Sequence, residues 1–308
     1  MSFEITILGS SSALPTSKKY PSAHVVNIHE RFFLIDCGEG TQIQLRKFKI
    51  RFSQINHIFI THLHGDHFFG IFGITSTFNL LGRKNDLHIY SPGNLEKKVY
   101  SVINKKEIGF NIFFHRLNHE NKEIIYESKS IEISAFPLKH RIETYGYLLK
   151  EKPKERNIKK EAITKYNLSI KDILSIKQGS DFITEAGNTI KNSKISIPPY
   201  QARSYAYCSD TMYSEEIIPY IKNTDILYHE ATFAKDLQET ATLTKHSSSV
   251  DAATIALKAN VSKLLIGHFS TRYKNTDTIE KEAKEIFSNT QAVQDGDKIK
   301  IPLVREKD

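Results

Sequence analysis

Three histidines and one aspartate lie within six residues of one another, in the run Thr61-His62-Leu63-His64-Gly65-Asp66-His67. Imidazole and carboxylate groups suit zinc and manganese, and catalytic zinc sites keep one position open for water. His62 and His64 are two residues apart, so their side chains point the same way on an extended backbone. Gly65 permits a tight bend that aims Asp66 and His67 toward a second metal. Because chance or core packing rarely produces such a run, we expect a two-metal hydrolytic site here.

Two metals need more ligands than this run supplies, and three further candidates stand just beyond predicted strands. They are His140 after Ile131–Leu138, Asp210 after Tyr205–Ser209, and His268 after Lys263–Gly267. Loops at one end of the parallel strands of a sheet converge on one site. Asp210 is suited to bridge two metals because a carboxylate has two oxygens. Each histidine alone is explained equally well by a surface role, but their shared position at strand ends favours a ligand role for both.

The elements that must position these groups are predicted from short apolar runs and from periodic spacing. Further strands cover Phe3–Leu8, Ala23–His29, Arg31–Asp36, His57–Thr61, Asp86–Tyr90 and Asp225–His229. Helices cover Thr41–Phe48, Gly70–Leu81, Ser249–Asn260 and Thr278–Phe287. Strands and metal-type residues therefore alternate in order along the chain.

The composition describes an ordinary globular protein that favours polyanionic partners. Hydrophobic residues make up 39% of the 308 residues and charged residues 25%. No run approaches the roughly 20 apolar residues of a membrane helix, and the first residues lack the pattern of a secretory signal, so a cytoplasmic location is the expectation. The net charge of +8 makes nucleic acid a candidate partner.

Two other sets of reactive side chains lack the spacing that is typical of a metal site. The two cysteines, Cys37 and Cys208, form no disulfide framework or zinc motif, and we expect both on buried core strands. Structural or surface roles are expected for six histidines: His24, His29, His57, His88, His115 and His119.

One stretch, from about Lys150 to Pro199, interrupts the strand pattern. Its first half is basic, with Lys150, Lys152, Lys154, Arg156, Lys159, Lys160, Lys165, Lys171 and Lys177. Because strands that end at candidate ligands resume at Tyr205, we interpret residues 150–199 as an insertion in one domain that spans residues 1–308. Composition alone would favour a solvated surface loop for this stretch.

Several motifs together resemble those of the metallo-β-lactamase superfamily and, within it, the ribonuclease Z family. The run from His62 to His67 follows a strand and the turn Asp36-Cys37-Gly38-Glu39-Gly40, which is typical of the superfamily. The narrower resemblance rests on downstream motifs: Ser209-Asp210-Thr211, His229-Glu230-Ala231-Thr232, His246-Ser247-Ser248 and His268-Phe269-Ser270-Thr271-Arg272-Tyr273. The order and spacing of these motifs fit along nearly the whole chain.

The resemblance implies an α/β fold, an αββα sandwich with an inserted flexible arm and a two-zinc site at one edge. It implies that one Zn²⁺ is held by His62, His64 and His140, the other by Asp66, His67 and His268, and that Asp210 bridges the two; Mn²⁺ is a substitute metal. Asp66 is then also the acceptor of a proton from water. Glu230 and His246 become proton-transfer partners, with His246 the preferred donor to the leaving group; local structural hydrogen bonds are the alternative. Ser270 and Arg272 become phosphate contacts, although a structural salt bridge explains Arg272 nearly as well.

The same resemblance implies a substrate, precursor tRNA, and a reaction, cleavage that removes the 3′ trailer. Residues 150–199 then correspond to an arm that grips tRNA, and a homodimer is implied in which the arm of one subunit serves the site of the other. The Gly-Pro motif common in such arms is absent here, and Leu168-Ser169-Ile170-Lys171-Asp172-Ile173-Leu174 stands in its place.

Three other functions share parts of this pattern. A phosphodiesterase of the same fold, acting on cyclic nucleotides or other small diesters, would share every metal ligand. A non-catalytic RNA-binding module would be expected to have lost some ligands, and all ligand types are present. A β-lactamase or thioester hydrolase fits less well, because His246 and Ser270–Arg272 point to the nuclease branch.

Overall fold

The computed structural model describes residues 1–118 and 120–307, and the prediction for His119 lies outside them. The chain forms two compact units. The first unit combines residues 1–150 with residues 204–301, and the second combines residues 151–203 with the segment that starts at Pro302. Within the described residues, no helix is long and apolar enough to cross a membrane.

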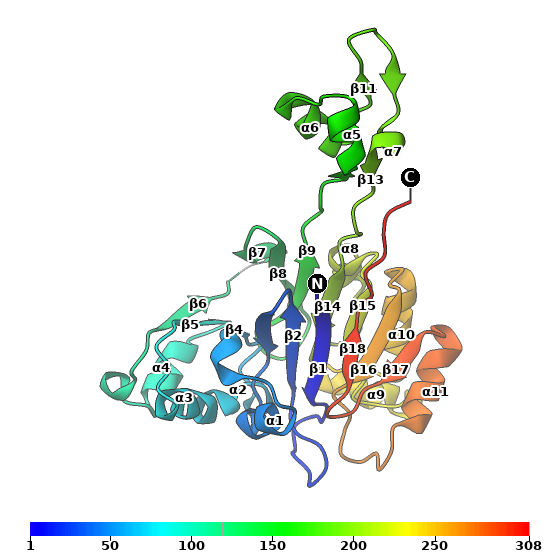
Figure 1. Ribbon diagram of the computed structural model, residues 1–308. Helices are drawn as coiled ribbons and strands as arrows, with labels where there is room; N and C mark the ends of the chain where they lie inside the picture. Colours follow the sequence, from blue (N-terminus) through cyan, green and yellow to red (C-terminus); the bar gives the residue numbers. More distant parts are fainter. Residues whose placement is uncertain (119, 308) are drawn as a thin grey trace. The chain divides into compact units, whose positions relative to one another are not determined.

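The first unit is built on two seven-stranded sheets (Figure 1). Strands β3 to β6 of the first sheet run parallel, and β4 leads directly into the histidine-rich run. In spatial order the strands are β18 (Lys298–Lys300), β1 (Phe3–Gly9), β2 (Ala23–Ile28), β3 (Arg31–Ile35), β4 (Ile55–Phe59), β5 (Leu87–Ser91) and β6 (Ile112–Arg116).

The second sheet supplies the other candidate ligands from the ends of its strands. Strands β14 to β17 are parallel, while β14 pairs antiparallel with β9. The spatial order is β17 (Thr290–Ala292), β16 (Lys263–Gly267), β15 (Ile226–Glu230), β14 (Ser204–Cys208), β9 (Thr144–Glu151), β8 (Ile131–Leu138) and β7 (Glu123–Glu127).

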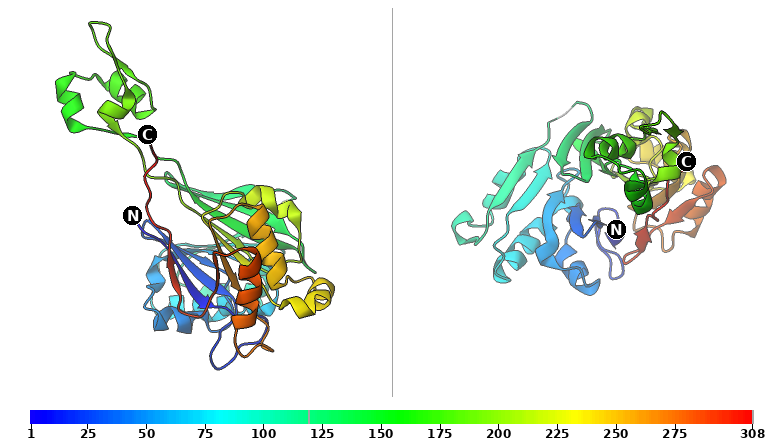
Figure 2. Two further views of the ribbon diagram at one scale, coloured as in Figure 1. Left: turned by 90° about the vertical axis from the view of Figure 1, so that its right-hand side faces the viewer. Right: turned by 45° about the horizontal axis from the view of Figure 1, so that its top comes forward.

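Helices cover the outer faces of both sheets (Figure 2). The first sheet packs against α1 (Thr41–Lys47), α3 (Gly70–Leu80) and α4 (Leu95–Tyr100). The second packs against α8 (Ile218–Ile221), α10 (Ser249–Lys258) and α11 (Asp277–Ile286). Shorter pieces are α2 (Gly65–Phe68), α9 (Gln238–Thr244) and the 3₁₀ turns Phe52–Gln54, Lys105–Glu107, Glu215–Ile217 and Lys235–Leu237.

The core lies in three layers, one between the sheets and one under each set of helices. Large aromatic rings fill the central layer, including Phe33, Phe59, Tyr147, Tyr207 and Tyr228, all essentially buried. Such rings remove a large apolar area from water, which drives the two sheets together. The layer order is helix, sheet, sheet, helix, so the predicted αββα sandwich is confirmed.

Most predicted elements are present with ends that differ by one or two residues, and one shift has a clear physical cause. The strand predicted over His57–Thr61 instead spans Ile55–Phe59. The Thr61 backbone N–H leaves the strand ladder because it donates a hydrogen bond to the Asp36 carboxylate at 2.8 Å. Both cysteines are free and buried, as predicted, but only Cys208 lies on a strand, because Cys37 stands in the turn after β3.

The second unit is a small folded body rather than an irregular loop. It contains β10 (Asn157–Ile158), α5 (Lys160–Lys165), α6 (Ile170–Lys177), β11 (Phe182–Ile183), β12 (Thr189–Ile190), α7 (Asn192–Ile195) and β13 (Ser196–Ile197). Its core consists of Ala162, Leu168, Ile176 and Ile195 with partly buried neighbours. Helix α6 begins with a capping box, in which Ser169 and Asp172 satisfy each other's backbone N–H groups. The solvated-loop alternative is therefore wrong as a description of its structure.

Candidate metal centre

The candidate ligands of the first unit come together from four separate segments of the chain, one of which includes α2. Residues 62–67 follow β4, His140 follows β8, Asp210 follows β14 and His268 follows β16. Their side chains form two groups that could each hold a metal ion: His62, His64, His140 and Asp210 in the first, and Asp66, His67 and His268 in the second. The seven residues predicted from the sequence therefore lie at one place.

The first group presents four atoms at similar separations. His62 Nε2 lies 3.0 Å from His64 Nδ1 and 3.4 Å from Asp210 Oδ2. His140 Nε2 lies 3.3 Å from His64 Nδ1 and 3.7 Å from Asp210 Oδ2. Zinc–nitrogen bonds of 2.0–2.1 Å in a tetrahedron separate neighbouring ligand atoms by about 3.4 Å. These four side chains therefore fit one tetrahedral metal ion.

The second group has the same spacing and uses the other oxygen of Asp210. His67 Nε2 lies 3.3 Å from both Asp66 Oδ2 and Asp210 Oδ1. His268 Nε2 lies 3.5 Å from Asp66 Oδ2 and 3.2 Å from Asp210 Oδ1. Asp210 thus turns one oxygen toward each group, as a bridging carboxylate does.

Two nitrogen atoms give independent support for a metal in the second group. His67 Nε2 and His268 Nε2 are buried and have no hydrogen-bond partner in the described structure. A buried polar atom without a partner costs free energy, and such an atom calls for an ion or ligand. Both nitrogens are aimed at the carboxylates of Asp66 and Asp210, so a shared cation would satisfy all of them.

Asp36, just after the end of β3, contacts His67 of the second group and Thr61, which contacts His62 of the first group. Its carboxylate accepts hydrogen bonds from the Thr61 backbone, the Thr61 hydroxyl, His67 Nδ1 and the Tyr207 hydroxyl, at 2.8–3.0 Å. The residue has φ of 56°, a conformation that favours a sharp turn out of the strand. Close packing continues at Gly38, where a side chain would meet the Asp66 carbonyl at 2.5 Å.

Glu230 has the corresponding place at the end of β15. Its Oε1 accepts from His246 Nδ1 and from the Thr211 backbone, each at 2.8 Å. Its Oε2 accepts from the Thr232 hydroxyl at 2.5 Å. Glu230 is completely buried, so these contacts replace the water that its charge has lost.

His246 lies over the ligands and is held in a charged state. Burial alone would lower the pKa of His246, but the charge and hydrogen bond of Glu230, with the charge of Asp210, raise that pKa to about 9. The ring of His246 stacks on the ring of His268, with 5.6 Å between the ring centroids. An imidazolium beside the ligand cluster is suited to donate a proton.

Asp66 and His140 are fixed by backbone groups. Asp66 Oδ2 accepts from the Ala13 N–H at 2.9 Å. Burial would raise the pKa of Asp66, but His67 and His268 together lower it, so the residue is a carboxylate. His140 donates from Nδ1 to the Lys245 carbonyl at 2.8 Å, which leaves Nε2 free to face the first group.

Ser270 and Arg272 lie on the loop that follows His268. Arg272 is exposed, stacks over the Phe233 ring at 5.0 Å and donates to the Ser270 hydroxyl at 3.1 Å. Within residues 1–118 and 120–307 no ion pair is formed by Arg272, so the salt-bridge alternative has no support. Its guanidinium has donors left for an anion.

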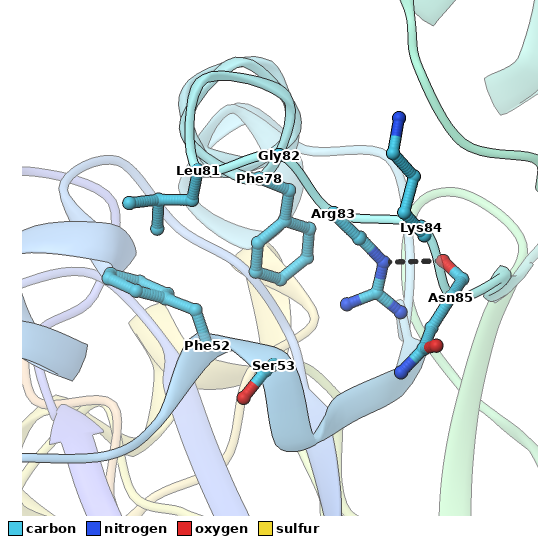
Figure 3. Close-up of a pocket in the computed structure, with 8 residues that line it drawn as sticks. All are labelled: Phe52, Ser53, Phe78, Leu81, Gly82, Arg83, Lys84 and Asn85. Carbon is cyan, nitrogen blue, oxygen red and sulfur yellow. Dashed lines mark hydrogen bonds between the residues drawn. The ribbon is translucent and has the colours of Figure 1, made fainter.

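A separate pocket of about 480 Å³, which none of the candidate ligands line, lies at the end of α3 (Figure 3). Phe52, Phe78 and Leu81 line it, together with Arg83. The Arg83 guanidinium donates to the carbonyls of Ile55, Asn85 and Asp86 and to the Asn56 side chain. Arg83 therefore braces local backbone.

Three polar residues that contact the candidate ligands or Asp36 were not predicted: Thr61, Thr232 and Tyr207. Thr61 and Thr232 lie inside the motifs that contain His62 and Glu230, so their position was a usable signal. Tyr207 lies within a predicted buried strand, where a tyrosine normally indicates packing. Its hydroxyl contact with Asp36 joins residues 171 positions apart, which local pattern does not reveal.

Comparison with protein families gives a match over half of the chain. Residues 3–159 match the model of a family described as Anti-Pycsar protein Apyc1. This range contains the run from His62 to His67 and also His140, but not Asp210 or His268.

Curated relatives match nearly the full length. A ribonuclease Z from Bacteroides thetaiotaomicron is 45% identical over 290 residues, covering 94% of this chain and 92% of the relative. One from Phocaeicola vulgatus is 43% identical over 98% of this chain and 99% of the relative. The crystal structure of human tRNase Z, short form, has the same fold, with a TM-score of 0.71 at 24% identity over 97% of this chain and 99% of that one. The chain therefore belongs to the ribonuclease Z family and, over residues 3–159, also to the family described as Anti-Pycsar protein Apyc1.

Proposed function

We propose that this chain is a zinc-dependent endoribonuclease that removes the 3′ trailer from precursor tRNA. Cleavage after the discriminator nucleotide leaves a tRNA 3′-hydroxyl and a trailer with a 5′-phosphate. The observation that carries the proposal is the pair of ligand groups joined by Asp210, in a chain with full-length ribonuclease Z relatives.

Two Zn²⁺ ions per subunit would be held by the residues that the geometry brings together. His62, His64 and His140 serve one ion, Asp66, His67 and His268 the other, and Asp210 both. When bound, the ions supply Lewis acidity that activates water and neutralises charge on the phosphate. Mn²⁺ accepts the same imidazole and carboxylate ligands and would substitute.

The protein side chains then carry the proton transfers. Asp66 is the proposed acceptor of a proton from the attacking water, the role that the resemblance to the family gives it. The new bond forms between the water oxygen and phosphorus as the bond from phosphorus to the tRNA 3′-oxygen breaks. His246, charged because Glu230 raises its pKa, donates its proton to that leaving oxygen. Ser270 and Arg272 bind the neighbouring phosphate through hydroxyl and guanidinium donors.

The second unit is proposed to bind the tRNA. Several of its basic side chains are engaged within the unit: Lys177 pairs with Glu155, and Lys191 with Asp181. Lys160 and Lys171 are exposed and have no such partner in the described structure. Cations of this kind bind phosphates without reading sequence. Residues 150–199 are accordingly the proposed substrate-binding arm.

A small-diester phosphodiesterase is the second candidate, because it would use the same metal ligands. The full-length relatives favour the tRNA-processing reaction, since the cited ones carry the name ribonuclease Z over more than nine-tenths of this chain. A homodimer with a shared arm and a cytoplasmic location accord with the proposed reaction and belong to the proposal.

The direct test incubates purified protein with a transcript that carries a defined 3′ trailer. We expect cleavage at the junction that stops on addition of a chelator and returns with Zn²⁺. Absence of metal-dependent cleavage at that junction, with cleavage of cyclic nucleotides instead, would favour the second candidate.

A further inference from the structure

Two threonines occupy equivalent places in the two halves of the metal centre. Thr61 precedes His62 and contacts Asp36, while Thr232 contacts His268 and Glu230. Each threonine thus connects one ligand histidine to one buried carboxylate. Both threonines are nearly or wholly buried, so water does not compete for their hydroxyls.

The hydrogen bonds of Thr61 determine which nitrogen of His62 carries a proton. The Thr61 hydroxyl lies 2.9 Å and 3.1 Å from the two oxygens of Asp36, which only accept. Its single hydrogen is therefore directed to Asp36. At His62 Nδ1, 3.0 Å away, the same oxygen must accept, so Nδ1 carries the proton. His62 Nε2 is left with a lone pair, and it is the atom that faces the first ligand group.

The same reasoning applies to Thr232 and His268. The Thr232 hydroxyl has two acceptors, Glu230 Oε2 at 2.5 Å and the His268 carbonyl at 3.0 Å. The Thr232 hydroxyl donates its single hydrogen to one of these two acceptors. Its oxygen therefore accepts a hydrogen bond from His268 Nδ1, which lies 2.9 Å away. His268 Nε2, which has no hydrogen-bond partner, keeps its lone pair toward Asp210 and Asp66.

We propose that Thr61 and Thr232 are a matched pair of positioning residues, which fix the tautomer and ring orientation of His62 and His268, one ligand in each group. This inference rests on the ligand roles given under the proposed function. A hydroxyl suits the task because it donates to the carboxylate and accepts from the imidazole at once. Partners of this kind typically change metal affinity by about 10- to 100-fold when removed.

The test replaces each hydroxyl with a methyl group of nearly the same size. Thr61→Val and Thr232→Val remove the acceptor, and Thr61→Ser and Thr232→Ser keep it. Thr75→Val is the matched control, because Thr75 is equally buried on α3 and its hydroxyl has no hydrogen-bond partner. Zinc content is measured by elemental analysis at increasing concentrations of a competing chelator.

We expect each valine variant to hold one zinc ion as tightly as the unsubstituted chain does. It should lose the other zinc ion at a chelator concentration about 10- to 100-fold lower than the unsubstituted chain requires. The serine variants and Thr75→Val should retain both. A second readout is the slowly exchanging Nδ1 proton of His62 and His268 in zinc-loaded, ¹⁵N-histidine-labelled protein. It should exchange faster for His62 in Thr61→Val and for His268 in Thr232→Val.

The outcomes separate this inference from the proposed function. If the original chain binds two zinc ions and the valine variants bind them equally well, the threonines do not position the ligands, and the proposed function stands. If the original chain binds no zinc, both fail. If a valine variant does not fold, the ¹⁵N-histidine spectrum of the unsubstituted protein still tests the inference. A proton on Nε2 of His62 or His268 in that spectrum would overturn it.

Discussion

The ligand cluster of the first unit and the basic surface of the second unit are organised in opposite ways. In the cluster, five of the seven candidate ligands are buried, and carboxylates or backbone groups hold them in place. In the second unit, a core of four buried apolar residues supports exposed lysines such as Lys160 and Lys171. Chemistry at a phosphorus atom requires fixed donors and acceptors, whereas phosphate binding along an RNA backbone tolerates mobile cations.

This difference predicts that substitutions in the cluster will abolish turnover on every substrate. Substitutions in the second unit will affect only large ones. Measuring each variant on two substrates, a precursor tRNA and a small chromogenic phosphodiester, therefore tests the comparison directly.

The largest effect is expected for Asp66→Ala. Asp66 is both a candidate ligand and the proposed proton acceptor, so its loss should reduce turnover of both substrates by on the order of 10⁴-fold. Binding of precursor tRNA, measured by filter retention, should change little because the second unit is intact. A variant that loses tRNA binding in parallel would contradict the separation of roles.

A smaller loss is expected for Glu230→Gln, in a way that depends on pH. The Glu230 charge raises the pKa of His246 to about 9, so His246 is a protonated donor below that pH and turnover falls as the pH rises through it. Without that charge the pKa of His246 falls, and the alkaline limb of the pH–rate profile for tRNA cleavage should move to lower pH. At neutral pH we expect a loss of about 10²-fold. An unmoved alkaline limb would exclude His246 as the proton donor.

Replacement of residues 151–203 of the second unit by a hairpin turn should separate the two substrates. Lys150 and Ser204 are partners in the antiparallel pair of β9 and β14, so a two-residue Asn-Gly turn can join them. Cleavage of precursor tRNA should fall by about 10²-fold, since phosphate contacts supply much of the affinity. Hydrolysis of the small diester should stay within about twofold. Equal loss of both activities in a folded variant would contradict a substrate-binding arm.

The smallest effect is expected for Lys160→Ala and Lys171→Ala together. Binding of precursor tRNA should weaken by about threefold to tenfold, and its dependence on salt concentration should become shallower. The control is the pair Lys98→Ala and Lys281→Ala, which removes the same charge from exposed helices of the first unit. A similar weakening in the control pair would mean that overall charge, and not the arm, attracts the RNA.

The sequence predicted the first unit better than the second for a physical reason. Candidate ligands such as His62, His140 and His268 stand just beyond strand ends, and apolar runs identify those strands. Residues that support the ligands act across long sequence separations: Tyr207 meets Asp36 in the central layer, and no local pattern records that contact.

In the second unit, two-residue strands and short helices carry too few apolar residues for clear periodicity. The sequence pattern around its small core, from Ala162 to Ile195, therefore does not differ from that of a solvated loop. The capping pair Ser169 and Asp172 was the available clue, because a serine followed three residues later by an acid favours a helix start.

The central claim is hydrolysis of one phosphodiester bond at the tRNA 3′ end, and mapping the product ends tests it most directly. A precursor labelled on both sides of the junction is cleaved by the zinc-loaded chain, with Asp66→Ala as the control. We predict a tRNA that ends in a 3′-hydroxyl after the discriminator nucleotide and a trailer with a 5′-phosphate, and neither product from the variant. A 3′-phosphate on the tRNA, cleavage at scattered positions, or equal cleavage by Asp66→Ala would contradict the account.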